Sequence, residues 1–364
     1  MTQTLRYRIH EVADYINWLY FFHAWGFQPR FAEIAGIHGC DACRAMWLAR
    51  FPEADRQKAV EAMQLHKEAV RMLNRLDPFY HVVVRFALFP CNSDGDDLVI
   101  AATLPSSKNP PFVIAAPSPS SKDPLVATAA PSPSSENPPS GTVAPSPSSK
   151  DPLLAATVPD GSPSGCYRLP LLRQQRAEGE CLCLADFLRP QNDAGQHDRI
   201  GIFAACADER IEHLYEPGTE DADDYRHLLC QTLADRLAEA AVERAHEEIR
   251  KRHWGYAPDE QLSIAELHAE RFQGIRPAVG YPSLPDQSIN FDLDRLIDFS
   301  AIGIRLTENG AMQPHAAVSG LMIAHPAARY FAVGRIGEDQ LVDYARRKGR
   351  TPEEMRPFLA GNLG

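Results

Sequence analysis

Short runs of hydrophobic residues along the chain predict several β-strands. Residues 81–89, 98–100 and 200–204 are rich in Val, Ile, Leu and Phe, and β-branched and aromatic side chains are typical of strands. Residues 320–324 and 331–334 have the same character and lie close together in the sequence. We therefore expect these two segments to pair as a late hairpin.

Helical spacing is clearest in residues 223–252, which we expect to form one long amphipathic helix. The apolar residues that recur there at intervals of four are Leu229, Leu233, Leu237 and Ala241. A second helix is predicted for residues 338–348, where Gly349 would end it. Because strands and helices do not alternate regularly, the pattern indicates an α+β domain rather than a parallel, doubly wound sheet.

Residues 101–165 differ in composition from the rest of the chain. They hold half of its 30 prolines, and a Ser-Ser pair recurs in them every 14 residues. Proline removes backbone donors and the tract has little apolar surface to bury, so we expect it to be disordered or polyproline-like. We expect residues 1–100 and 166–364 to form one discontinuous domain around this insertion. A docking or modification site in the repeats is the alternative to a simple loop expansion.

Overall composition excludes several classes of protein. A net charge of −11 with no basic stripe argues against nucleic acid as a partner. No apolar run approaches the roughly 20 residues that span a bilayer, so we expect no membrane association. The polar first ten residues lack a secretory signal, which favours a cytoplasmic location.

Residues 274–282 are the most informative short segment for chemistry. They read Gly-Ile-Arg-Pro-Ala-Val-Gly-Tyr-Pro, and the two prolines predict a stiff, non-helical loop. This loop would present Arg276 and Tyr281. A guanidinium can donate two parallel hydrogen bonds to a carboxylate, so Arg276 is a candidate anion ligand. A proline-rich connection with a surface arginine would have the same composition.

Further segments match one known family in its own order over nearly the whole chain outside the insertion. They are residues 183–187, 233–237, 254–258, 271–282, 306–308, 311–312, 318–320, 325–326 and 343–349. In these segments the chain resembles the C-terminal reactivation domain of cobalamin-dependent methionine synthase, which binds S-adenosylmethionine (AdoMet). The resemblance implies a single domain with a twisted, mainly antiparallel sheet and flanking helices.

The resemblance also implies roles for residues in and near the loop. Arg276 would bind the carboxylate of AdoMet, and the backbone around Ala278 would contact its adenine or ribose. Tyr330 would lie beside the ligand through its ring or backbone, while Phe331 replaces a tyrosine that is frequent in the family. A core strand residue is the alternative for Phe331. Tyr281 would lie towards the cobalamin and is the one residue considered for a catalytic position.

Four other positions match polar residues of the family's ligand cleft. Asn17 replaces an aspartate that accepts a hydrogen bond from the AdoMet ammonium, so the charge is lost while an acceptor remains. Glu239 and Glu270 match acidic positions and would stabilise a positively charged ligand, although a solvated surface is the alternative for both. Gln287 stands where the family commonly has histidine.

One cysteine motif lies outside this pattern. His38, Cys40 and Cys43 form His-Gly-Cys-Asp-Ala-Cys, a spacing that suits zinc or redox chemistry. Because the chain has no second cysteine pair with this spacing, the motif supplies only part of the four-ligand set of a structural zinc site, and we expect no metal. The sequence does not decide whether Cys40 and Cys43 bind one.

The resemblance implies a reactivation subunit of a split methionine synthase, a methyltransferase of methionine biosynthesis. The chain has no cobalamin-binding Asp-x-His-x-x-Gly segment and no cysteine-rich homocysteine site, so it would not be catalytically complete alone. Cobalamin would be held by a partner methionine synthase subunit, and a flavodoxin-like protein would supply an electron. Two alternatives remain: a reactivase for another corrinoid methyltransferase, and a non-enzymatic AdoMet sensor or remnant.

Overall fold

The computed structural model describes residues 1–102, 166–191 and 197–363. The disorder expected of the proline-rich tract concerns residues 103–165, which lie outside the described part. The two strands that flank this tract are nevertheless hydrogen-bonded to each other.

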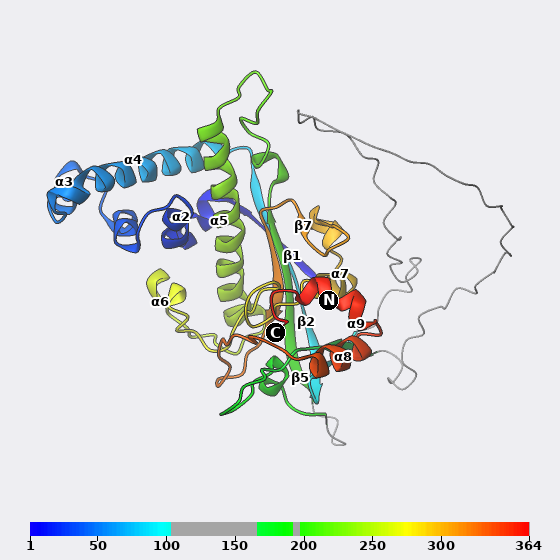
Figure 1. The fold of residues 1–364 in the computed structure, drawn as a ribbon. Helices are drawn as coiled ribbons and strands as arrows, with labels where there is room; N and C mark the ends of the chain where they lie inside the picture. The colour runs from blue at the N-terminus through cyan, green and yellow to red at the C-terminus, as the bar shows by residue number, and fades with distance from the viewer. Residues whose placement is uncertain (103–165, 192–196, 364) are drawn as a thin grey trace, which may run out of the picture. The chain divides into compact units, whose positions relative to one another are not determined.

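A twisted antiparallel sheet forms the centre of the described fold (Figure 1). Its strands are β1 (Gln3–Arg8), β2 (His81–Asp94), β3 (Asp97–Ala101), β4 (Cys166–Pro170), β5 (Asp198–Ala207) and β8 (Ala317–Met322). The order is β4-β3-β2-β5-β8, and β1 also pairs with β2. A separate small pair consists of β6 (Arg305–Leu306) and β7 (Met312–Gln313). The sheet uses strands from both sides of residues 103–165, and the predicted strands at 81–89, 98–100 and 200–204 are confirmed.

Helices cover both faces of this sheet. The α-helices of the described residues are α1 (Ile9–Val12), α2 (Trp18–Ala24), α3 (Asp41–Leu48), α4 (Glu53–Leu76), α5 (Asp224–Glu248), α6 (Ile264–His268), α7 (Ile289–Ile297), α8 (Glu338–Arg347) and α9 (Pro352–Leu359), of which α5 and α7 pack on opposite faces of the sheet. On β5, Phe203 and Ala205 belong to the hydrophobic core between the sheet and α5. Ile202 and Ala204 belong to the core on the opposite face, together with α7. This alternation follows from the two-residue period of a strand.

The two predicted helices are confirmed with small changes at their ends. The first is α5, which ends at Glu248 and continues as one π-helical turn over Ile249–His253. All four of its predicted apolar residues are buried. The second is α8, and Gly349 follows it with a φ of 65°, a left-handed conformation that favours glycine.

The predicted hairpin between residues 320–324 and 331–334 is wrong. Only the first segment is part of a strand, and residues 331–334 are irregular. The edge of β8 is instead occupied by the loop that carries Arg276, because Ile275 pairs with Ile323 and Ala278 pairs with Gly320. Because the Arg276 loop occupies the edge of β8, residues 331–334 do not pair with this strand. Val333 instead donates its backbone N–H to Pro282 O at 2.8 Å.

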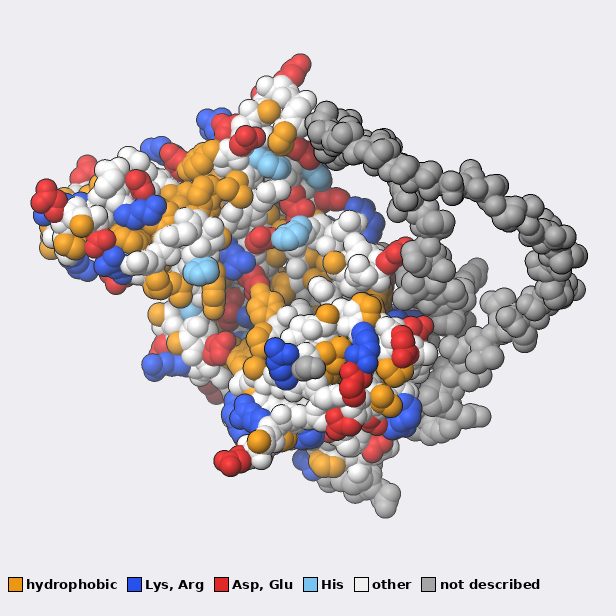
Figure 2. All heavy atoms as spheres, in the orientation of Figure 1, with side chains coloured by type: hydrophobic (Ala, Val, Ile, Leu, Met, Phe, Trp, Pro, Cys, Tyr) orange, Lys and Arg blue, Asp and Glu red, His pale blue; other side chains and the backbone are white. Residues whose placement is uncertain are grey.

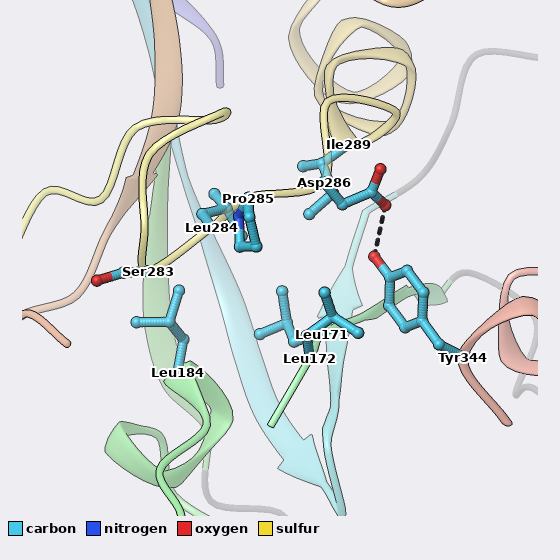
Figure 3. A pocket seen from close by; sticks show the side chains of 9 residues that line it. All are labelled: Leu171, Leu172, Leu184, Ser283, Leu284, Pro285, Asp286, Ile289 and Tyr344. Atoms are coloured by element: carbon cyan, nitrogen blue, oxygen red, sulfur yellow. Dashed lines mark hydrogen bonds between the residues drawn. The ribbon is translucent and has the colours of Figure 1, made fainter. Parts of the chain in front are cut away.

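A buried ionic cluster ties α8 to the segment that follows the Arg276 loop, and Figure 3 shows its contact between Asp286 and Tyr344. Asp286 is fully buried and accepts hydrogen bonds from the Tyr344 hydroxyl at 2.6 Å and the Ser288 hydroxyl at 2.7 Å. Lys348 Nζ lies 3.0 Å from the same carboxylate. Burial alone would raise the pKa of Asp286, but the Lys348 charge and these donors hold it below its usual value.

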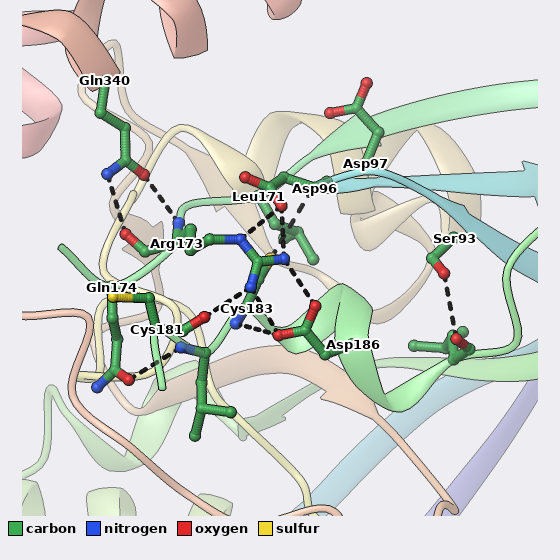
Figure 4. Close-up of polar contacts among 12 residues, drawn as sticks. Ser93, Asp96, Asp97, Leu171, Arg173, Gln174, Cys181, Cys183, Asp186 and Gln340 are labelled. Atoms are coloured by element: carbon green, nitrogen blue, oxygen red, sulfur yellow. Dashed lines mark hydrogen bonds and ion pairs between the residues drawn. The ribbon is translucent and has the colours of Figure 1, made fainter. Parts of the chain in front are cut away.

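A second polar cluster fixes the chain where it leaves β4 (Figure 4). The guanidinium of Arg173 lies 2.6 Å from both Asp96, in the β2–β3 turn, and Asp186. The Gln340 side chain on α8 accepts from Arg173 N–H at 2.8 Å and donates to Arg173 O at 2.9 Å. These contacts hold β3, β4 and α8 together at one end of the sheet.

No helix in the described ranges has the length and apolar character required to cross a membrane.

The pairing of β3 with β4 yields a prediction for the proline-rich tract. Ala101 lies opposite Cys166, so the two ends of the tract meet at neighbouring strands. Replacing residues 103–164 by a short Gly-Ser linker should leave the melting temperature nearly unchanged, because closure entropy depends only weakly on loop length. Thermal unfolding followed by circular dichroism tests this. A large drop in melting temperature would show that the tract contributes to the fold.

Candidate ligand-binding site

The Arg276 loop runs along the edge of β8 as an additional, irregular strand. Leu321 donates its N–H to Pro277 O at 3.0 Å, and Val279 donates to Ser319 O at 2.9 Å. Both bonds flank Ala278, so the N–H and C=O of Ala278 itself point away from β8. The loop is therefore fixed by backbone bonds; Ala278 O accepts from Tyr281 N–H at 3.3 Å, while the Ala278 N–H faces away from the sheet.

Two glycines make this close approach possible. A Cβ atom at Gly320 of β8 would lie 2.2 Å from Pro277 O, far inside contact distance. At Gly274 the φ is 90°, and a Cβ would lie 2.3 Å from Ile323 O. Only glycine fits either position, and the loop begins at the second of them.

Arg276 forms a partly buried ion pair with Glu243 of α5. Its Nη2 lies 2.7 Å from Glu243 Oε2, and the two side chains are only 12% and 13% exposed. The backbone N–H of Arg276 donates to the Tyr330 hydroxyl at 2.9 Å. Three segments that are far apart in the sequence therefore meet at Arg276.

Each partner of this ion pair keeps one polar atom unused. Among the described residues, neither Arg276 Nε nor Glu243 Oε1 has a hydrogen-bond partner, although both atoms are buried. Buried polar atoms are usually satisfied, and an exception needs an explanation such as a ligand. The free donor suits an anionic group, and the free acceptor suits a cationic one.

The charges around Arg276 are mainly negative. Burial would lower the pKa of Arg276, but the charge of Glu243, with smaller effects of Tyr330, Glu239 and Glu270, keeps it above its usual value. Burial raises the pKa of Glu270, against the opposing effect of the Arg276 charge. The arginine therefore stays charged, and the site favours a ligand that also carries a positive group.

Tyr281 lies at the outer end of the loop, against α5. Its hydroxyl donates to Glu239 Oε1 at 3.0 Å, and the residue is 53% exposed. The Glu239 charge, followed by burial, raises the pKa of Tyr281 to about 12, so the phenol stays neutral. Glu239 precedes Glu243 by one helical turn, which places both carboxylates on the same side of α5.

Asn17 lies close to this side of α5 without a direct contact to Arg276. Its side chain caps α2 by accepting from Leu19 N–H at 3.2 Å. Nearby Tyr15 donates its hydroxyl to Glu247, one turn after Glu243, at 2.7 Å. The segment therefore borders the row of glutamates, and Asn17 acts as a helix cap.

Tyr330 and Phe331 point to different parts of the molecule. Tyr330 is 37% exposed and contacts Arg276 through its hydroxyl. Phe331 packs against the core on the α7 side, 6.5 Å from the Phe187 ring, and its backbone N–H donates to the Ser283 hydroxyl at 3.1 Å. The structure therefore brings Tyr330 to Arg276 and packs the half-buried Phe331 against the core.

Two residues of this region were missed in the sequence. Glu243 was not singled out, because its one signal, a spacing of four from Glu239, is equally typical of a solvated helix face. His246 is 1% exposed, packs 4.9 Å from the Phe272 ring and has no hydrogen-bond partner for either ring nitrogen among the described residues. Burial, helped by the charges of Arg250 and Arg276, lowers its pKa well below the usual value, so it is uncharged.

The histidine–cysteine motif lies elsewhere, at the start of α3. Cys40 caps this helix, and the Cys43 backbone N–H donates to Cys40 Sγ at 3.3 Å. A hydrogen bond from His38, with two further bonds from Cys43, lowers the pKa of Cys40 to about 6.

Comparison with known proteins identifies the fold. The family model for the vitamin B12 dependent methionine synthase activation domain matches residues 8–112 and 150–349. The chain belongs to this family. The match omits residues 113–149, which lie within the proline-rich tract.

A solved structure supports the same assignment for this activation domain. The chain is similar to the crystal structure of the MetH reactivation domain bound to AdoHcy, with 32% sequence identity and a TM-score of 0.72. The alignment covers 100% of this chain and 90% of that one. The predicted family and the α+β fold with an antiparallel sheet and flanking helices are both confirmed.

Close packing at Gly320 generates a prediction about stability. Gly320→Ala should lower the free energy of unfolding by about 1–3 kcal/mol, because the added methyl would displace the Arg276 loop from β8. Gly36→Ala is the matched control, since Gly36 has open space around it and no positive φ. Urea denaturation of the two variants measures the difference. Equal stabilities would contradict the close approach.

Proposed function

We propose that this chain binds AdoMet at the Arg276 site and supports reductive methylation of a cobalamin that a separate methionine synthase subunit holds. The observation that carries the proposal is the partly buried Arg276–Glu243 pair, in which each partner has one buried polar atom without a hydrogen bond among the described residues. AdoMet has a carboxylate, an ammonium and a sulfonium, so it matches both the donor and the acceptor. The similar reactivation domain was crystallised with AdoHcy, which shares the same amino-acid end.

Each polar group of the site would bind a different part of AdoMet. Arg276 would hold the carboxylate through a charge-assisted hydrogen bond, and the outward peptide of Ala278 would contact the nucleoside. Glu239, Glu243 and Glu270 would stabilise the two cationic groups by Coulomb attraction.

Two further residues would border the ligand. The partly exposed ring of Tyr330 could face the sulfonium, a cation–π contact of about 1 kcal/mol. Asn17 would supply a neutral acceptor from the α2 cap in place of the family's aspartate.

AdoMet supplies the methyl group when it is bound. This chain's own residues would position it and exclude water, which is the main contribution that a protein makes to a cofactor reaction of this kind. Tyr281 is exposed at the outer end of the loop and would lie on the side that meets the partner's cobalamin. A flavodoxin-like protein would supply the electron. In this proposal the chain is one part of a split methionine synthase in methionine biosynthesis.

The first test concerns AdoMet binding. Arg276→Ala should weaken the affinity by about 2–4 kcal/mol, which is roughly 30- to 1000-fold, because a charge-assisted bond to the carboxylate is lost. Arg276→Lys keeps the charge without the planar guanidinium, so its AdoMet affinity should lie between those of the wild type and Arg276→Ala. Arg329→Ala is the matched control, because Arg329 is exposed and pairs with Glu180. Isothermal titration calorimetry measures all four proteins, and equal affinity in Arg276→Ala would rule out this site.

The second test concerns reactivation. The isolated chain should not transfer a methyl group from methyltetrahydrofolate to homocysteine. Given AdoMet and a reductant, it should restore activity to an oxidised methionine synthase that lacks its own activation domain. Tyr281→Arg should reduce this reactivation far more than AdoMet affinity, whereas Phe79→Arg, at another strongly exposed aromatic residue, should change neither.

Three outcomes would change the assignment. Turnover by the isolated chain would overturn the proposed division of labour between subunits. Normal AdoMet binding without reactivation of any methionine synthase would favour a sensor, or a reactivase for another corrinoid methyltransferase. Absence of AdoMet binding would indicate a remnant, which the replacements at Asn17, Phe331 and Gln287 would fit.

A further inference from the structure

A cluster of metal-ligating side chains lies apart from the Arg276 site, at the start of α3. Figure 1 shows this helix at the end of α4 that points away from the sheet. The ligand atoms of His38, Cys40 and Cys43 all lie within 4.8 Å of one another. We propose that these three side chains bind one Zn²⁺ ion, with the fourth position open to water or to a ligand from a partner.

The spacing of the donor atoms is close to that of a tetrahedral zinc site. Zn–S bonds of about 2.3 Å and Zn–N bonds of about 2.0–2.1 Å place neighbouring donors about 3.4–3.8 Å apart. The three donors therefore need to approach by about 1 Å. His38 is exposed and both cysteines are half-buried, so rotation of these side chains can close the gap without moving the core.

The local chain explains why the three donors meet. Cys40 is the cap of α3, and Cys43 lies in its first turn, so the helix directs both thiols to one side. The N–H of Cys43 already donates to Cys40 Sγ at 3.3 Å, and outer hydrogen bonds of this kind orient metal-bound ligands. Gly39 carries no side chain that could separate His38 from Cys40.

The chemistry of the donors selects the metal. Thiolates and imidazole favour zinc over magnesium or calcium, which prefer oxygen ligands. Two thiolates and a neutral imidazole carry a charge of −2, which Zn²⁺ neutralises, and the start of a helix favours negative charge. A bound ion would therefore link the segment before α3 to the first turn of the helix. The competing interpretation is a dithiol that cycles with a Cys40–Cys43 disulfide and leaves His38 unused.

The test uses the full chain, reduced and freed of metal, and then reconstituted with Zn²⁺ or Co²⁺. Elemental analysis after removal of excess metal should give one zinc per chain, and the Co²⁺ form should show sulfur-to-metal charge-transfer bands. Cys43→Ser should lose the bands, and His38→Ala should bind the metal at least about tenfold more weakly in competition with a chelator. Cys181→Ser is the matched control, because Cys181 is also a half-buried free thiol but lies outside the cluster.

Each outcome is decisive. Zinc retained by the wild type and by Cys181→Ser, but lost from Cys43→Ser, supports the site. Wild-type protein that takes up no zinc when reduced overturns it, and a Cys40–Cys43 disulfide in the oxidised protein would then assign a redox pair. Equal zinc in Cys43→Ser and wild type also overturns it. Circular dichroism shows whether the variants fold, and AdoMet affinity, which depends on Arg276, should not change, so this test is independent of the proposed function.

Discussion

The backbone pairing between residues 275–279 and the edge of β8 determines where the other groups of the candidate site can lie. This edge would otherwise present unpaired N–H and C=O groups, which invite another strand. The loop satisfies them with bonds at Pro277 and Val279, and Gly320 leaves the space that its close approach requires. Because the loop is fixed on both sides of Ala278, the Arg276 side chain is directed across to α5 instead of following a mobile surface loop.

The ion pair between Arg276 and Glu243 should not be counted as a large source of stability. Removing two charges from water is costly, and the attraction between them often does no more than offset that cost. Here each partner also keeps an unsatisfied buried atom, a further cost of about 1–3 kcal/mol for each atom. Such an arrangement is more typical of a binding site than of a core, whereas the fully bonded Asp286 cluster is typical of a structural one.

Much of the fold could be predicted from the sequence, because its signals are local. The apolar period of α5 and the hydrophobic runs of β2 and β5 depend on neighbouring residues. The hairpin prediction failed because strand pairing is non-local. The two apolar segments do not reveal that residues 275–278 pair with the edge of β8 instead.

The residues of the candidate site were also chosen from local signals in the sequence. The composition of residues 274–282 indicated Arg276 and Tyr281, and the family resemblance added Tyr330 and the glutamates. Glu243 could not be separated from an ordinary solvated helix face, because only the folded loop covers it. The sequence did indicate His38, Cys40 and Cys43 as a motif, but the closeness of their three ligand atoms appears only in the fold.

The pairing of Arg276 with Glu243 also has a consequence for selectivity. At the proposed site an incoming carboxylate would compete with Glu243 for the guanidinium, so a simple acid would leave the partly buried Glu243 charge without a partner. A simple amine would likewise compete with Arg276 for Glu243 and leave the guanidinium charge without a partner. Only a molecule that brings both charges on one short backbone can replace the internal contact with two new ones. In the proposed site, the Arg276–Glu243 pair would therefore act as an internal competitor that disfavours singly charged metabolites and favours zwitterions of the amino-acid type.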